Sequence, residues 1–104
     1  MKIYGSEMCP DCVACKKNFD HYGIEYDFID INLSLRDLKQ FLIYRDHDHV
    51  FNHCKEINDI GLPALVMDDD SISLDWEGLL KEKGLTILEE EETVEACSLD
   101  RKGC

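Results

Sequence analysis

Three cysteines lie at a spacing of three near the start of the chain, in the stretch SEMCPDCVAC that covers residues 6–15. Cysteine thiolates attack disulfide bonds, and they also bind soft metals and iron–sulfur clusters. The stretch therefore indicates either a redox centre or a metal site, and the surrounding residues have to distinguish between the two.

Cys9 and Cys12 have the spacing that dithiol exchange requires. Pro10 suits the first position of a helix, where its fixed φ and missing N–H carry no penalty. Cys9 then lies at the helix cap, where unpaired backbone N–H groups and the helix dipole stabilise a thiolate. Cys12 follows one turn later on the same side. We expect Cys9 to attack a substrate disulfide and the more buried Cys12 to resolve the mixed disulfide.

Asp11, between these two cysteines, allows two interpretations. A carboxylate in the first turn of a helix stabilises that helix through its dipole. At about 6 Å from a thiolate, with an effective dielectric constant of about 40, the same charge would destabilise the thiolate by about 1.4 kcal/mol. Asp11 is therefore either a helix-stabilising residue or a group that tunes Cys9.

The other four cysteines have simpler interpretations. Cys15 shares one face of the predicted helix with Phe19, and we expect it to be a small core residue rather than a ligand or a resolving thiol. Cys54 has the same explanation within a later helical segment. Cys97 and Cys104 near the C-terminus are expected to be incidental rather than a second redox pair.

A second candidate metal site lies in the middle of the chain. His49 and His53 are one helical turn apart, and imidazole together with the Cys54 thiolate suits zinc. Histidines on the outer face of a helix, beside Asp46 and Asp48, need no metal. We favour exposed histidines over a zinc site.

The elements that must position the first cysteines alternate in type. Residues 2–5 predict a short strand, and a helix from Pro10 to about Tyr22 is ended by Gly23. Residues 25–31 have the β-branched and aromatic content of a second strand. The pattern predicts a βαβ unit with the cysteine pair between the first strand and the helix.

Helical segments follow. Ser34 is predicted to cap a helix whose Leu35, Leu38 and Leu42 form one stripe. A second helical segment is predicted over residues 49–58. Its apolar positions are Val50, Cys54 and Ile57.

The second half of the chain predicts a hairpin and a last helix. Residues 64–67 are an apolar run typical of a buried strand, residues 68–71 have turn chemistry, and residues 72–76 return as a second strand. A short helix over residues 77–83 should end at Gly84.

The chain has 104 residues, which is enough for one domain with a proper core. We expect that domain to cover residues 1–84 and an acidic C-terminal extension to cover residues 85–104. The extension can be helical, strand-like or frayed. Its run of four glutamates over residues 89–92 is interpreted as a solvated face rather than a binding site.

Composition limits the partners and the compartment. The net charge is −12, with eleven Lys and Arg residues scattered among twenty-three Asp and Glu residues, which argues against nucleic-acid binding. The start has no apolar run of signal-peptide length, and no segment approaches a membrane span. We expect a cytoplasmic protein that acts as a monomer, in a compartment that keeps resting thiols reduced.

A C-x-x-C motif that opens a helix after a first strand is typical of thioredoxin-like redox proteins, and here it reads Cys9-Pro10-Asp11-Cys12. Leu62-Pro63 directly before a predicted buried strand strengthens the signal. On these motifs the chain resembles the glutaredoxins, and more closely the small bacterial glutaredoxin-related proteins with C-P-D-C. The resemblance covers about residues 1–84.

The resemblance implies a fold and a set of roles. The fold is α/β, a single thioredoxin-like domain of the glutaredoxin type with a four-stranded mixed sheet flanked by helices. Cys9 and Cys12 take the nucleophilic and resolving roles. Pro10, Asp11, Leu62 and Pro63 take part in substrate binding, with a cis peptide bond before Pro63 and the Leu62 backbone offered to a substrate segment.

Two departures from the family pattern concern glutathione. Glutaredoxins usually carry a lysine shortly before the first cysteine, whereas this chain has Ser6-Glu7-Met8. They also carry a Gly-Gly pair beyond the last strand, whereas this chain has Ser73-Leu74-Asp75. Glutathione is a candidate reductant, but its usual binding residues are not evident. No covalently bound cofactor is expected.

The sequence is compatible with three functions. The first is a thiol-disulfide oxidoreductase that acts on protein disulfides or mixed disulfides, with a low-molecular-weight thiol or another cytosolic reductant as partner. The second is a soft-metal or iron–sulfur protein that uses Cys9, Cys12 and Cys15. The third is a regulatory thiol switch that binds a partner through its acidic surface. Pro10 and Pro63 together favour the oxidoreductase.

Overall fold

The computed structural model describes residues 1–88, which form a four-stranded sheet with helices on both sides. The elements follow the order β1 (Lys2–Gly5), α1 (Pro10–His21), β2 (Asp27–Asp30), α2 (Leu35–His47), the 3₁₀-helix η1 (His49–Phe51), α3 (Asn52–Glu56), β3 (Ala64–Val66), β4 (Ile72–Ser73) and α4 (Trp76–Glu82). The predicted succession of a βαβ unit, helices and a ββα unit is confirmed.

The sheet is mixed, with the strand order β2-β1-β3-β4. β1 and β2 are parallel, as the connecting helix α1 requires, and Ile3 pairs with Phe28 in their register. β3 is antiparallel to both β1 and β4, and it pairs Leu65 with Ile3 and with Ser73. This is the α/β fold that the resemblance implied.

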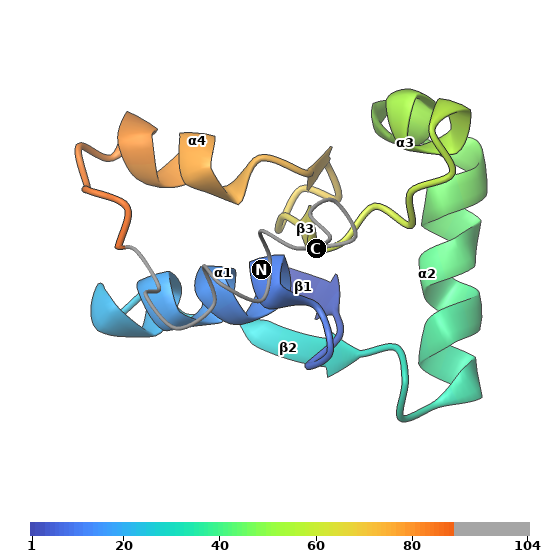
Figure 1. Cartoon of the computed structure of the whole chain (residues 1–104), viewed down its shortest axis with the longest axis horizontal. Coiled ribbons are helices and arrows are strands. Elements are labelled where there is room, and N and C mark those ends of the chain that lie inside the picture. The colour runs from blue at the N-terminus through green and yellow to red at the C-terminus, as the bar shows by residue number, and fades with distance from the viewer. Residues whose placement is uncertain (89–104) are drawn as a thin grey trace.

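Each face of the sheet carries its own core. α1 and α4 cover one face, and α2 and α3 cover the other (Figure 1). Because strand side chains alternate, Ile3 and Leu65 pack with Phe19, Trp76 and Leu80 on the α1 and α4 side. The opposite core is formed by Tyr4, Ile31, Phe41, Phe51, Cys54, Ala64 and Val66.

The predicted leucine stripe of α2 is wrong. Ser34 caps the helix as expected, and its Oγ accepts a hydrogen bond of 3.3 Å from the Asp37 N–H. The buried face, however, is centred on Phe41, whose ring lies 6.2 Å from that of Tyr4, whereas Leu35 is 75% exposed. Leu42 is also exposed. The predicted leucine stripe and the buried face centred on Phe41 share Leu38. The face with Phe41 is the buried one because an aromatic side chain buries more apolar area than a leucine does.

The second helical segment is also rearranged. The Asp48 carboxylate accepts a 2.9 Å hydrogen bond from the Val50 N–H and starts η1, and α3 follows without a gap. Phe51 and Cys54 are buried, but Val50 and Ile57 are exposed. The predicted burial of Cys54 is therefore confirmed, while two of its predicted apolar neighbours face solvent.

The hairpin is shorter than predicted, because β4 contains only two residues and Trp76 belongs to the following helix. Asp75 caps α4, and its carboxylate accepts a 2.9 Å hydrogen bond from the Gly78 N–H. Trp76, the first residue of α4, is buried in the core between the sheet and α1, with Phe19 and Leu65.

Beyond Gly84, which has the positive φ of a helix terminator, residues 85–88 lie against α1. The Tyr22 hydroxyl donates to the Thr86 carbonyl at 2.6 Å. The Asn18 side chain donates a hydrogen bond to the Leu88 carbonyl and accepts one from the Leu88 N–H. The rest of the expected extension, with Cys97 and Cys104, lies outside the described residues. Over residues 1–88, no helix combines the length and apolar character needed to cross a membrane.

Candidate functional site

Cys9 occupies the N-cap of α1, at the end of a tight turn that follows β1. The Cys9 N–H donates to the Ser6 carbonyl at 3.1 Å, which fixes the turn. The Cys9 sulfur in turn accepts a hydrogen bond of 3.4 Å from the backbone N–H of Cys12. Cys9 is only half-buried, so its sulfur is both stabilised as an anion and open to a substrate.

These contacts lower the pKa of Cys9 to about 7. The largest cause is a hydrogen bond from the Cys12 thiol to the Cys9 sulfur, and the backbone N–H groups of Cys12 and Asp11 add to it. Burial and the negative charge of Asp11 act in the opposite direction. About half of Cys9 is therefore thiolate at neutral pH.

Cys12 lies behind Cys9 and is only 1% exposed. Its sulfur packs against the backbone of Gly5, and a Cβ added there would lie 2.9 Å from that sulfur. The pKa of Cys12 is raised, first because its thiol donates to the Cys9 sulfur and second because it is buried. The pair thus holds one thiolate in front and one protonated thiol behind.

Cys15 and Cys54 take no part in this pair. Cys15 is fully buried with Ile3 and Phe19, and burial raises its pKa to about 12. Burial also raises the pKa of Cys54, which lies in the core on the other face of the sheet. Both are core residues, as predicted.

No cluster of three or more His, Cys, Asp or Glu side chains within residues 1–88 is arranged to hold a metal ion. Cys15 therefore does not complete a metal site with Cys9 and Cys12, and neither do the residues around His49 and His53. His49 and His53 are exposed, and His53 lies 3.8 Å from Glu56.

Asp11 has a partner that sequence reasoning missed. The Trp76 Nε1–H donates to a carboxylate oxygen of Asp11 at 3.2 Å, which joins the start of α4 to the start of α1. Burial raises the pKa of Asp11, the hydrogen bond from Trp76 opposes the rise, and the charge of Asp59 adds to it. Sixty-five residues separate the two partners, so no local pattern could have predicted the contact.

A groove of about 360 Å³ opens beside the Cys9 sulfur. Its apolar lining is Met8, Ile31, Ile60 and Leu62, and its polar lining is Ser6, Cys9, Asp11, Asn32 and Asp59. The structure thus brings Leu62 to the same groove as Cys9, and the Leu62-Pro63 peptide bond is cis, as the resemblance implied. The side chain of Pro63 is fully buried.

Of the predicted substrate-binding residues, Asp11 and Leu62 line the groove, whereas Pro10 at the start of α1 and Pro63 in the loop before β3 are next to them in the chain and do not line it. Asp59 and Asn32 are groove residues that the sequence analysis did not select. Asn32 contacts the Ser6 hydroxyl, and this hydroxyl also accepts a 3.0 Å hydrogen bond from the Met8 N–H.

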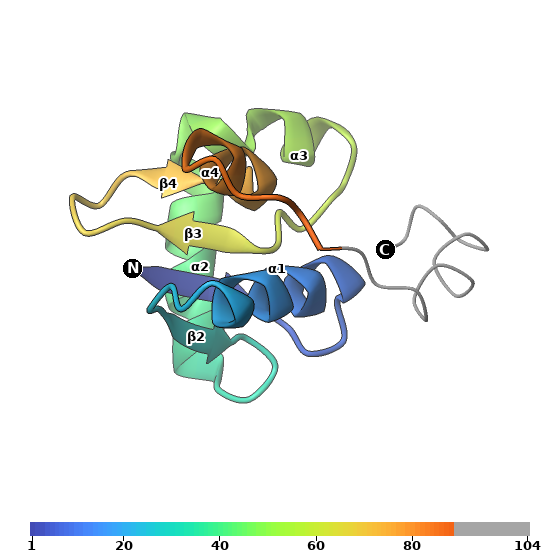
Figure 2. The same cartoon turned by 90° about the vertical axis from the view of Figure 1, so that its left-hand side faces the viewer.

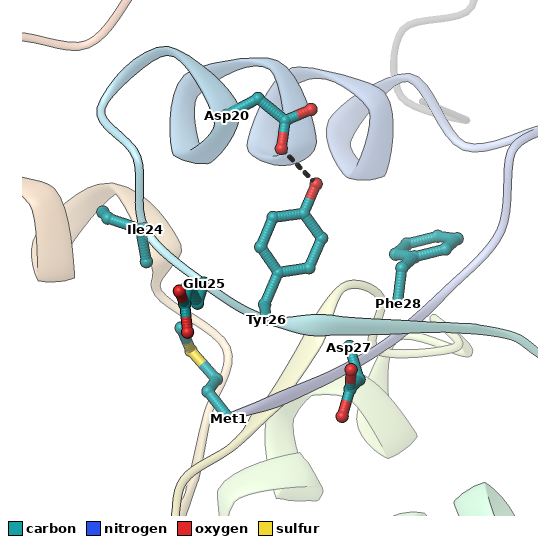
Figure 3. Close-up of a pocket in the computed structure, with 7 residues that line it drawn as sticks. All are labelled: Met1, Asp20, Ile24, Glu25, Tyr26, Asp27 and Phe28. Carbon is teal, nitrogen blue, oxygen red and sulfur yellow. Dashed lines mark hydrogen bonds between the residues drawn. The ribbon is translucent and has the colours of Figure 1, made fainter.

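A larger hollow, of about 630 Å³, lies elsewhere, beside β2 and the end of α1 (Figure 3). Tyr26 projects across it toward α1, and its hydroxyl donates to Asp20 at 2.7 Å. The lining contains neither cysteine nor histidine, and the Tyr26 hydroxyl is already paired. The smaller groove, with an activated thiol in its wall, is the candidate active site.

The mixed sheet, the cysteine pair at the start of α1 and the cis-proline loop beside it define an α/β protein with a glutaredoxin-type thioredoxin fold. Residues 1–46 match the Glutaredoxin family model, and over these residues the chain belongs to the glutaredoxin family. A protein of Haemophilus influenzae described only as uncharacterized is 34% identical over 77 residues, which cover 74% of this chain and 90% of that protein. No solved structure matches the chain.

Proposed function

We propose that the protein is a dithiol–disulfide oxidoreductase in which Cys9 is the nucleophile and Cys12 the resolving thiol. The observation that carries this proposal is the pair of sulfurs at the start of α1. The pKa of Cys9 is lowered to about 7 by donors that include Cys12, and Cys12 stays protonated and buried directly behind it.

The proposed reaction has two steps. The Cys9 thiolate attacks one sulfur of a substrate disulfide, the S–S bond breaks, and the first substrate thiolate leaves and takes up a proton from water. Cys12 then loses its proton and attacks the Cys9 sulfur, which releases the second substrate thiol and leaves a Cys9–Cys12 disulfide. Two electrons pass to the substrate, and a thiol reductant returns the protein to its starting state.

The pairing of the two thiols supports the order of these steps. The largest cause of the raised pKa of Cys12 is its hydrogen bond to the Cys9 sulfur. Once Cys9 is in a mixed disulfide it carries no negative charge, so this cause weakens and Cys12 loses its proton more readily. Cys12 therefore keeps its proton, and stays a weak nucleophile, until the first step is complete.

Residues around the groove have proposed roles in binding. The backbone of Leu62, in the loop that also holds Pro63, positions the substrate segment beside Cys9, and Asp11, which follows Pro10 in the first turn of α1, lines the same groove. The substrates are protein disulfides or mixed disulfides. Glutathione remains a candidate reductant, and we expect the protein to act as a monomer in the cytoplasm, where resting thiols are kept reduced.

An exchange assay on a model protein disulfide tests the proposal. The native chain and the Cys15→Ser variant should reduce the substrate, because Cys15 lies in the core away from the pair. Cys9→Ser should be inactive, and Cys12→Ser should accumulate a mixed disulfide through Cys9 that mass spectrometry detects. Full activity of Cys9→Ser, or a native chain that carries bound metal and has no exchange activity, would contradict the proposal.

A further inference from the structure

Resting on the exchange function proposed above, we propose that the groove beside Cys9 selects disulfides that carry a positively charged group next to an apolar group. The selecting residues are Asp11 and Asp59, with Ile60 and Leu62 as the apolar wall.

Two carboxylates and no lysine, arginine or histidine are among the residues that line this groove. Asp11 comes from the first turn of α1, and Asp59 comes from the loop between α3 and β3. They are close enough to interact, since the charge of Asp59 raises the pKa of Asp11. A cationic group in the groove would relieve this repulsion, and an anionic group would add to it.

Both carboxylates are held in place by donors of the protein. Asp11 accepts from Trp76 Nε1–H at 3.2 Å, and Asp59 accepts from the Ile60 N–H at 2.7 Å. Trp76 is buried and anchored in the core, so it fixes Asp11 to a rigid part of the molecule. Each bond uses one carboxylate oxygen, and the second oxygen is the acceptor that we assign to the substrate.

Two basic side chains, Lys16 and Arg45, contact groups other than the groove carboxylates. Lys16 pairs with Glu7 and lies 4.1 Å from the centre of the Phe28 ring. Arg45 donates to the backbone carbonyls of Asp59 and Ile60, at 2.5 and 3.3 Å, and so holds the loop through its main chain. Neither Lys16 nor Arg45 pairs with the Asp11 or Asp59 carboxylate, and we assign these carboxylates to a ligand.

The remaining wall of the groove suits an apolar neighbour of the cation. Ile60 is exposed and Leu62 half-buried, and Met8, which precedes Cys9 in the chain and also lines the groove, is 82% exposed. Such side chains at the entrance to a reactive thiol gain contact area when an apolar group covers them. The favoured substrate thus presents a disulfide sulfur to Cys9, a cation to the two carboxylates and an apolar group to Ile60 and Leu62.

The chemistry of selection can be measured with three small disulfides of similar size, which carry amino, hydroxyl or carboxylate ends. Each rate is divided by the rate of a neutral small thiol with the same disulfide, which removes differences in intrinsic reactivity. At low ionic strength the corrected rate should be about five- to tenfold higher for the amino than for the hydroxyl compound, and lowest for the carboxylate compound. Added salt should reduce the ratio.

Charge-neutral variants locate the effect. Asp59→Asn should reduce the ratio of amino to hydroxyl rates severalfold, and so should Asp11→Asn. Asp70→Asn is the matched control, because it removes the same charge from the β3–β4 turn, at the opposite end of the sheet from the start of α1 (Figure 2). The ratio should be unchanged in this control.

Two synthetic peptide disulfides identify the source of the ligand. One has lysine and leucine beside the cysteine, and the other has glutamate and leucine. If the ratio of the lysine-peptide rate to the glutamate-peptide rate exceeds the ratio for the small amino and carboxylate compounds, the groove recognises a cation on a polypeptide. If the rates differ only among the small compounds, the groove recognises a small aminothiol disulfide.

Equal corrected rates for the three small disulfides, or a higher rate for the carboxylate compound, would overturn this inference while the exchange function stands. No reaction with any disulfide would instead overturn the exchange function. A ratio that falls equally in Asp70→Asn and Asp59→Asn would show that net charge, and not the groove, selects the substrate, which also contradicts the inference.

Discussion

The Cys9 sulfur is partly ionised at neutral pH, because some of its contacts lower its pKa and others raise it. Donors from Cys12 and Asp11 favour the thiolate, while burial and the Asp11 carboxylate disfavour it. Because the donors dominate, the pKa falls from 9.0 to about 7 and not further. A thiolate with a pKa near the ambient pH combines a useful ionised fraction with good nucleophilicity.

Asp11 should be a residue whose charge costs stability. Its pKa is raised in the folded state above 3.8, so the folded chain binds the proton more tightly than the unfolded chain does. Stability is therefore lost as the pH rises from about 4 through the folded pKa, and the full cost is present at neutral pH. We predict that Asp11→Asn, which retains an oxygen for Trp76, raises the Tm at pH 7 and lowers the pKa of Cys9.

The control for this prediction is the same comparison of Asp11→Asn with the native chain at pH 3. Because both side chains are then neutral, the gain in Tm should disappear. A Tm at pH 7 that falls in Asp11→Asn would show that the carboxylate stabilises the start of α1 more than its desolvation destabilises it.

Gly5 is the residue that lets Cys12 lie against the sheet. An added Cβ would meet the Cys12 sulfur and the Phe28 ring, both at 2.9 Å. We predict that Gly5→Ala lowers the free energy of unfolding by about 1–3 kcal/mol, as overpacking does in other cores. Displacement of Cys12 should also lengthen the lifetime of the mixed disulfide in stopped-flow measurements; unchanged unfolding and unchanged lifetime would contradict this assignment.

At the scale of the elements, the order of strands and helices follows from local signals. Pro10 starts α1, Ser34 caps α2, and Gly23 and Gly84, both with positive φ, follow the ends of α1 and α4. Each of these residues acts within one turn of its own position. This is why the succession of elements could be predicted from the sequence alone.

What could not be predicted depends on contacts between distant elements. On α2, the leucine stripe and the stripe through Phe41 share Leu38, and the contacts of Phe41 with Tyr4 and Phe51 select the second. The bond from Trp76 to Asp11 and the approach of Asp59 to the groove depend equally on tertiary packing. The cysteine pair was predictable because its spacing lies within one helix; the charged wall of the groove was not.

The segment after α4 is tied to α1 through one buried side chain, and this tie can be tested. Asn18 is only 1% exposed; its amide donates to the Ala14 and Leu88 carbonyls, and its oxygen accepts from the Leu88 N–H at 2.7 Å. We predict that Asn18→Leu lowers the free energy of unfolding by about 1–3 kcal/mol, because the backbone groups of Leu88 lose their partners.

Tyr22→Phe is the matched comparison, since it removes one exposed hydrogen bond to Thr86 on the same segment and should cost under about 1 kcal/mol. Denaturant unfolding of both variants measures the difference. Equal small effects would mean that the buried hydrogen bonds of Asn18 to Leu88 stabilise the fold no more than the exposed bond to Thr86 does.

At the scale of the whole molecule, the dominant property is a net charge of −12 on 104 residues. Such a charge opposes compaction through self-repulsion, and salt screens it. We predict that the Tm rises between low and physiological ionic strength, by roughly 4–8 °C for each 1 kcal/mol gained. Differential scanning calorimetry measures this shift, and a Tm that falls with added salt would indicate that local ion pairs outweigh the overall repulsion.

The most direct test of the account is the pH dependence of the alkylation of Cys9 by iodoacetamide, followed on the Cys9 peptide by mass spectrometry. We predict a half-maximal rate near pH 7 in the native chain. The midpoint should be higher in Cys12→Ala, which removes the main donor, and closer to the native value in Cys12→Ser, which keeps a hydroxyl donor. A midpoint near pH 8.5 in the native chain, as for an ordinary cysteine, would contradict the proposed role of Cys9 as an activated nucleophile.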